Sequence, residues 1–171
     1  LELYTSGIER DDSHYLMSVT KSILSTLIGI AIDQKIIPSE NTPLNELIPE
    51  NLFKRKSQIK KYGSINLKDV MGMSALDVSD PPRDNSQRAI AIQNRHLNSS
   101  NRLEFVLESP IQDGDRKQLK YNDQTPTLGS GILSYISGKS AFEFAGKYLF
   151  EPLGFKNSEW MHQDKAGINM G

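Results

Sequence analysis

The stretch of sequence that decides the fold is MSVTKSILSTLIGIAID, residues 17–33. Seven of the ten residues from 23 to 32 are apolar, and together they cover nearly every face of a helix. A helix of this kind belongs in the interior of a protein, so we expect a buried helix from about Ser18 to Gln34. The apolar run is too short to span a bilayer, which takes about 20 residues.

Composition limits the classes of protein to which the chain can belong. Its 171 residues are 37% hydrophobic and 24% charged, which is typical of one soluble globular domain. The net charge of −1 gives no reason to expect nucleic acid or an acidic membrane as a partner. The absence of cysteine excludes disulfides, thiolate metal sites and a cysteine nucleophile. No signal peptide is visible, and the missing initial Met suggests a processed product or a fragment.

Capping residues predict further helices along the chain. Asn66 is expected to cap a short helix that runs to Met73, and Asn101 one that ends before Pro110. In the last third, Thr125 and Pro126 are expected as the cap and first residue of a helix that Gly138 ends. A further helix is predicted to follow that glycine.

Other segments carry further signals. Ser140 and Glu143 have the spacing of a capping box for that following helix. Residues 1–5 alternate apolar and polar side chains, which predicts a short strand. Residues 77–85 contain two prolines and three aspartates, and we expect a loop there.

A serine and a lysine at the start of the apolar helix have the spacing S-x-x-K. Residues three apart lie on one side of a helix, so the Lys21 amine can reach the Ser18 hydroxyl. Serine needs a base to act as a nucleophile, and an amine can serve if burial favours its uncharged form. The pair Ser57 and Lys60 has the same spacing, but it lies in a basic, polar stretch and is expected to be a solvated face. On spacing and context alone, an N-cap serine followed by a surface lysine remains the competing interpretation.

Two segments resemble one known family. The first is residues 17–33, and the second is YNDQTPTLGSGILSYISGKSAFEFAGKYLFEPLGF, residues 121–155. Together they are similar to the serine β-lactamase and penicillin-binding-protein superfamily, in its class C β-lactamase, esterase and nylon-oligomer-hydrolase branch. Two looser matches, residues 66–77 and 160–171, follow in family order. The resemblance implies an α+β chain that is mainly helical as present, with little of the family's antiparallel sheet.

The resemblance also implies a reaction. Ser18 would attack an ester or amide carbonyl and become acylated, Lys21 would take its proton, and Tyr121 would serve the leaving group. Asp123 and Trp160 would line the substrate site. The implied ligand is a small ester or amide, and the implied enzyme needs neither a metal nor another cofactor.

The chain departs from the family pattern in two places. Asp123 stands where the family usually has asparagine, and a carboxylate there would contact Lys21 and favour its charged form. The family's K-T-G or H-x-G strand, its C-terminal strands and the second oxyanion donor are absent from the sequence. Residues 1–171 are therefore expected to be one partial domain, and the isolated chain is expected to be weakly active or inactive.

Three hypotheses remain open on the sequence. The first is a serine hydrolase, the second is a non-catalytic penicillin-binding or sensor relative or an inactive fragment, and the third is a helical domain whose S-x-x-K is coincidental. The third predicts Lys21 in solvent and far from Tyr121. The three histidines have no metal-site spacing. The resemblance implies a bacterial envelope or secreted protein, with the cytoplasm as the alternative, and the oligomeric state is left open.

Overall fold

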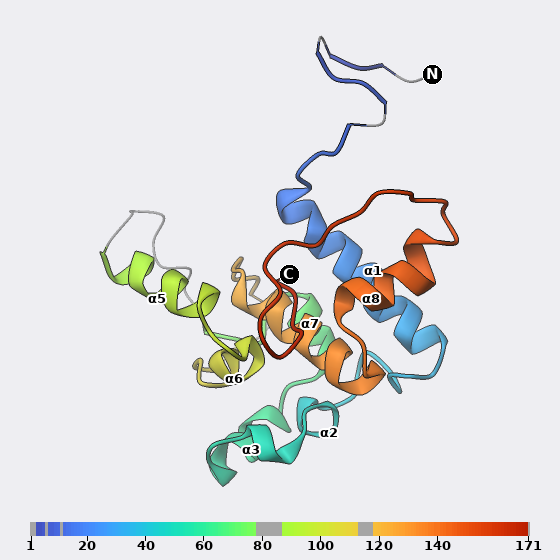
Figure 1. Ribbon diagram of the computed structural model, residues 1–171. Coiled ribbons are helices and arrows are strands. Elements are labelled where there is room, and N and C mark those ends of the chain that lie inside the picture. Colours follow the sequence, from blue (N-terminus) through green and yellow to red (C-terminus); the bar gives the residue numbers. More distant parts are fainter. Residues whose placement is uncertain (1–2, 6, 11, 78–86, 113–117, 171) are drawn as a thin grey trace.

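The computed structural model describes residues 3–5, 7–10, 12–77, 87–112 and 118–170, with the backbone alone for residues 88 and 89. The chain is mainly helical, as the sequence predicts (Figure 1). Its helices are η1 (Met17–Val19), α1 (Thr20–Asp33), α2 (Leu44–Leu47), η2 (Glu50–Leu52), α3 (Lys56–Tyr62), α4 (Leu67–Met71), α5 (Gln87–Leu97), α6 (Arg102–Leu107), α7 (Gln124–Ser137), α8 (Ala141–Ala145) and the π-helical turn η3 (Gly146–Phe150). Over the described ranges, extended pairing is limited to three isolated bridges.

Three of the predicted N-terminal helix caps are present, at Asn66, Asn101 and Ser140. The side chain of Asn66 accepts a hydrogen bond from the backbone of Asp69 at 3.0 Å, and that of Asn101 accepts one from Glu104 at 3.1 Å. Ser140 caps α8 in the same way, with a distance of 3.2 Å to the Glu143 nitrogen. Gly138 ends α7 with a φ of 66°, a left-handed conformation that glycine adopts without steric cost. These local signals need no tertiary context, which is why the sequence predicts them correctly.

Helix α1 is not buried on all sides, which corrects the sequence prediction. Its buried residues lie on one face (Leu24, Leu27, Ile28 and Ala31). On the opposite face Ser22, Ser25, Thr26 and Gly29 are exposed. Helix α1 is therefore amphipathic. Its apolar side chains are concentrated on the buried face, and its exposed face is made of small side chains.

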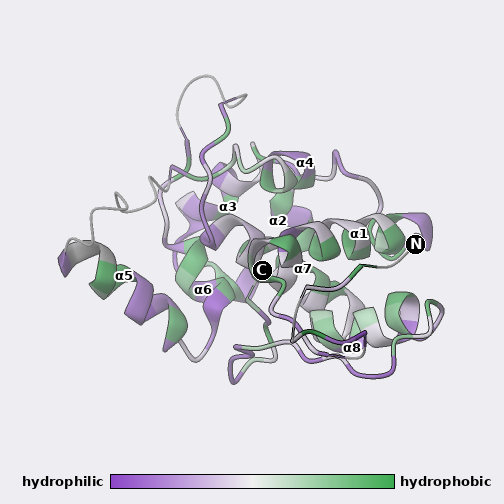
Figure 2. Cartoon of the chain, turned by 90° about the horizontal axis from the view of Figure 1, so that it is seen from above, coloured by the Kyte–Doolittle hydropathy of each residue, from purple (hydrophilic) through white to green (hydrophobic). Residues whose placement is uncertain are grey.

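Helix α7 is the central element of the core. All ten residues from 124 to 133 are buried, and α7 packs against α1, α4, α6 and α8 (Figures 1 and 2). Its glycines allow close approach, since a Cβ on Gly129 would lie 3.4 Å from Ile28 of α1. A Cβ on Gly131 would lie 3.0 Å from Leu103 of α6. The helix begins at Gln124 after Asp123, so the prediction of Thr125 as cap and Pro126 as first residue is wrong by two residues.

Two further differences from the sequence predictions lie at the periphery. Residues 3–5 are exposed and are not part of a strand; residues 1 and 2 lie outside the described ranges. Figure 1 shows this N-terminal segment leading away from the helices. Helix α5 was not predicted, and of the expected loop at 77–85 only Asp77 falls among the described residues.

One histidine is buried on α5. His96 is 3% exposed, and its ring stacks on Phe105 of α6 with centroids 5.3 Å apart. Its Nε2 has no hydrogen-bond partner among the described residues. Burial, with a smaller contribution from the charge of Arg102, lowers the pKa of His96 to about 4. The imidazole is therefore neutral in the folded protein at pH 7.

The close contact at Gly131 yields a first prediction. In Gly131→Ala the new methyl group overlaps Leu103, and overpacking of this kind should lower the free energy of unfolding by roughly 1–3 kcal/mol. The matched control is Gly29→Ala, because no atom lies within 4 Å of its added Cβ. Alanine at that helical position should raise the free energy of unfolding by roughly 0.5–1 kcal/mol. Urea titration measures both, and equal effects would mean that α6 and α7 do not approach as described.

The buried imidazole yields a second prediction. Below its ordinary pKa of 6.5, His96 takes up a proton in the unfolded chain but not in the folded one until about pH 4. The free energy of unfolding should therefore fall between pH 6.5 and pH 4, with about 2–3 kcal/mol of the loss due to this residue. His96→Phe removes the titrating group, so its stability should fall less over that window. Parallel curves for variant and wild type would show that the imidazole is accessible to protons.

Candidate active site

Ser18 lies in η1, the single turn that precedes α1, and its side chain is exposed. The Val19 nitrogen donates to the Leu16 oxygen at 3.0 Å and closes this turn. Met17 adopts a φ of 49°, in the left-handed region that residues other than glycine seldom occupy. Backbone strain of this kind clusters at functional sites, where surrounding structure holds it in place.

Lys21 lies in the first turn of α1, three residues after Ser18. Its Nζ donates to the Ser18 Oγ across 3.4 Å, a long hydrogen bond. The side chain is 13% exposed, so the amine is held at the edge of the core and not in bulk solvent. The spacing of three residues therefore has the geometric consequence that the sequence suggests.

Tyr121 comes from the segment that leads into α7. Its hydroxyl donates to the Ser18 Oγ at 2.6 Å, although the two residues are 103 positions apart in the chain. The ring also lies beneath the lysine, with Lys21 Nζ 5.4 Å from its centroid, a distance at which an ammonium is attracted to the ring face. The phenol and the amine thus both point toward one serine oxygen.

Asp123 forms an ion pair with the lysine. Its Oδ1 lies 2.8 Å from Lys21 Nζ, and its side chain is 45% exposed. The carboxylate contacts Lys21, as expected from the sequence. A positive charge at the edge of an apolar core is costly unless it is paired, and this carboxylate provides the pairing.

Asn122, which lies between Tyr121 and Asp123, was not predicted from the sequence. It is 1% exposed, and its Oδ1 accepts a hydrogen bond of 2.7 Å from the Thr125 nitrogen at the start of α7. Asparagine is a favoured capping residue, but residue type alone does not show that Asn122 faces the interior. The threonine–proline pair predicted a later start of the helix, so a hydrogen bond from the Thr125 nitrogen to Asn122 was not expected.

Trp160 is placed differently from the other candidates. It is partly buried against the hydrophobic core, and its indole nitrogen donates to the Met170 oxygen at 2.8 Å. Its described contacts make it a packing residue of the C-terminal segment. The structure thus brings together Ser18, Lys21, Tyr121 and Asp123, while Trp160 has a structural contact of its own.

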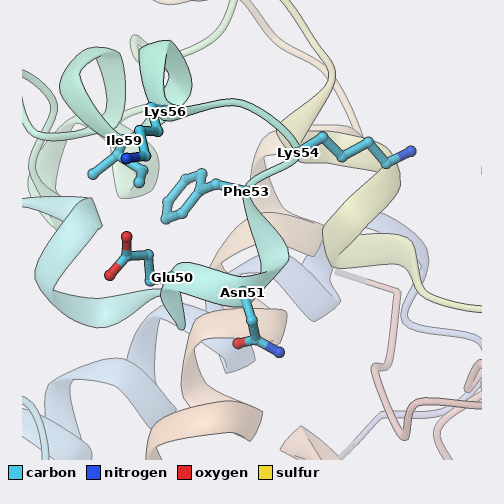
Figure 3. Close-up of a pocket in the computed structure, with 6 residues that line it drawn as sticks. All are labelled: Glu50, Asn51, Phe53, Lys54, Lys56 and Ile59. Atoms are coloured by element: carbon cyan, nitrogen blue, oxygen red, sulfur yellow. The ribbon is translucent and has the colours of Figure 1, made fainter.

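The second S-x-x-K pair lies in different surroundings. Ser57 and Lys60 are both exposed on α3. Beside them is an open hollow whose walls are Glu50, Asn51, Phe53, Lys54, Lys56 and Ile59 (Figure 3). No tyrosine lines this hollow, and the charged groups at its rim are solvated. This pair therefore serves as an internal comparison for the site at Ser18.

Metal sites and membrane-spanning helices are both absent from the described residues. No group of three or more histidine, aspartate or glutamate side chains in those ranges is arranged to hold a metal ion. In the same ranges, every helix is too short or too polar to cross a bilayer.

Comparison with known proteins finds a short similarity to a hydrolase. A stretch of 50 residues is 44% identical to the 6-aminohexanoate-dimer hydrolase of Paenarthrobacter ureafaciens. The aligned stretch is 29% of this chain and covers 12% of that hydrolase. No family model matches the chain. The chain is therefore related in part to a hydrolase, over a small share of that enzyme's length.

Proposed function

We propose that the chain is part of a serine hydrolase that acts on amide or ester bonds through an acyl-serine intermediate. The observation that carries this proposal is the convergence on one oxygen. Tyr121 Oη lies 2.6 Å and Lys21 Nζ 3.4 Å from Ser18 Oγ. In an activated serine, the nucleophile and its base generally lie within hydrogen-bond reach, and a third group orients them.

Each group then has a proposed role in the reaction. The Ser18 Oγ attacks the substrate carbonyl carbon, and its proton passes to the uncharged form of the Lys21 amine. The tyrosine hydroxyl is exposed, so it can deliver a proton to the departing amine or alcohol. Water then cleaves the acyl-serine ester and releases the acid. The backbone N–H of Ser18 is one donor for the oxyanion.

Similarity to the 6-aminohexanoate-dimer hydrolase supports an amide as the substrate bond, because two amino acids join through an amide. The ion pair between Asp123 and Lys21 argues against a direct role of Asp123 in substrate binding. We assign it the role of holding the lysine amine near the serine, at 2.8 Å. For Trp160, packing against the core is the role that its contacts support.

The ion pair also favours a second candidate, a non-catalytic relative that is acylated without turnover. The Lys21 amine lies 2.8 Å from the Asp123 carboxylate but 3.4 Å from Ser18 Oγ, so it is held more closely by the carboxylate than by the serine. In this second candidate the serine still reacts, but the acyl group leaves slowly.

The proposal predicts covalent labelling of one serine. A fluorophosphonate should react with the full chain by forming a bond from Ser18 Oγ to phosphorus and expelling fluoride. Ser18→Ala should abolish labelling. Lys21→Met and Tyr121→Phe should slow it, by roughly 10²–10⁴-fold where proton transfer is lost. Intact-protein mass spectrometry and peptide mapping measure the rate and the site.

Ser57→Ala is the matched control, because Ser57 has the same spacing to a lysine on an exposed helix. It should label at the wild-type rate. Labelling that survives Ser18→Ala, or none at all in the wild-type chain, would contradict the proposal. Release of nitrophenol from a nitrophenyl ester separates the two candidates, since steady turnover indicates a hydrolase and a single burst indicates slow deacylation.

A further inference from the structure

Asn122 is the buried member of the segment that carries Tyr121 and Asp123. Its side chain is 1% exposed, whereas Tyr121 is 40% exposed and the Asp123 side chain 45%. The two outer residues therefore face the serine and the lysine while the middle one faces the interior. A polar side chain in that position needs partners for its donor and its acceptor.

Both ends of the Asn122 amide are bonded within the segment. Its Nδ2 donates to the Lys120 oxygen at 2.7 Å, on the N-terminal side of Tyr121. Its Oδ1 accepts from the Thr125 nitrogen at 2.7 Å, on the C-terminal side of Asp123. One amide group thus ties together the two sides of the turn that presents the phenol and the carboxylate.

The turn is also anchored to the rest of the protein at both sides. The Lys120 nitrogen donates to the Met73 oxygen at 3.0 Å, next to the end of α4. At the other side, Thr127 Oγ1 donates to the Asp123 oxygen at 2.8 Å within α7. These anchors fix where the turn begins and ends, and the amide of Asn122 fixes its shape between them.

We propose that Asn122 is a positioning residue, which holds Tyr121 Oη on Ser18 and the Asp123 carboxylate on Lys21 through its two backbone hydrogen bonds. The inference rests on the proposed function, because the groups that it positions are those assigned to proton transfer. Asparagine is suited to this role because its amide donates and accepts at once, whereas an aspartate only accepts. A displacement of about 1 Å at a reacting group can cost roughly 10²-fold in rate.

Two substitutions separate positioning from folding. Asn122→Ala removes both bonds, whereas Asn122→Asp keeps an acceptor for Thr125 and loses the donor to Lys120. The matched control is Asn101→Ala, because Asn101 caps α6 by accepting from Glu104 at 3.1 Å and is not part of the site. All three are made in the full chain, and circular dichroism with the melting temperature checks that each variant folds.

The first readout is the labelling of Ser18 by a fluorophosphonate, resolved into kinact and KI. Both Asn122 variants should lose roughly 10- to 100-fold in kinact, with KI nearly unchanged and an altered dependence of kinact on pH. Asn101→Ala should keep the wild-type kinact despite a comparable fall in melting temperature. A kinact that follows the melting temperature across all three variants would overturn the proposal, since it would mark a purely structural role.

The second readout is a crystal structure of Asn122→Asp, which does not depend on reactivity. The distance from Tyr121 Oη to Ser18 Oγ should increase from 2.6 Å to beyond hydrogen-bonding reach. An unchanged distance would overturn the positioning role even if labelling were slower. Failure of the wild-type chain to label would instead count against the proposed hydrolase, and this structure would still decide the role of Asn122.

Discussion

The close packing of α1 against α7 is the constraint on which the rest of the structure depends. Gly129 has no side chain where Ile28 and Leu24 approach, and their nearest atoms lie 3.4 Å and 3.7 Å, respectively, from the position of a Cβ. The two helices can therefore lie in contact along their apolar faces. Because Lys21 of α1 meets Asp123 at the start of α7, the two helices begin at the same end of this interface.

The contacts of the site follow from the fact that α1 and α7 begin at the same end of their interface. A lysine at the edge of an apolar core is stable only with a partner of opposite charge, and Asp123 supplies one from the other helix. Tyr121, two residues earlier, is then close enough to donate to Ser18. The ion pair and the hydrogen bond between phenol and serine thus both depend on the two helices beginning at the same end of their interface.

The sequence predicts best the features that depend on a few neighbouring residues. Asn66, Asn101 and Ser140 cap helices because each side chain reaches a backbone nitrogen three residues on. The approach of Lys21 to Ser18 depends on the same local helical geometry, and resemblance to a family was needed to add Tyr121. How far the resemblance extends to the fold stays a prediction, because short helices and isolated bridges occur in many architectures.

Features that depend on distant contacts could not be predicted. The exposed face of α1 consists of small residues that hydropathy does not distinguish from a buried surface. Helix α5 has a polar composition. Its contact with α6 includes the stacking of the His96 ring on Phe105, which the sequence of α5 alone does not indicate. Asn122 was missed because its importance depends on which side of the turn faces inward.

The most direct measurement of the central claim is a crystal structure of the chain after acylation by an ester or a fluorophosphonate. We expect electron density continuous with Ser18 Oγ. We also expect Tyr121 Oη and Lys21 Nζ to lie within about 3.5 Å of that oxygen. A phenol 10 Å or more from the serine, roughly three times hydrogen-bonding reach, in an otherwise intact fold would contradict it.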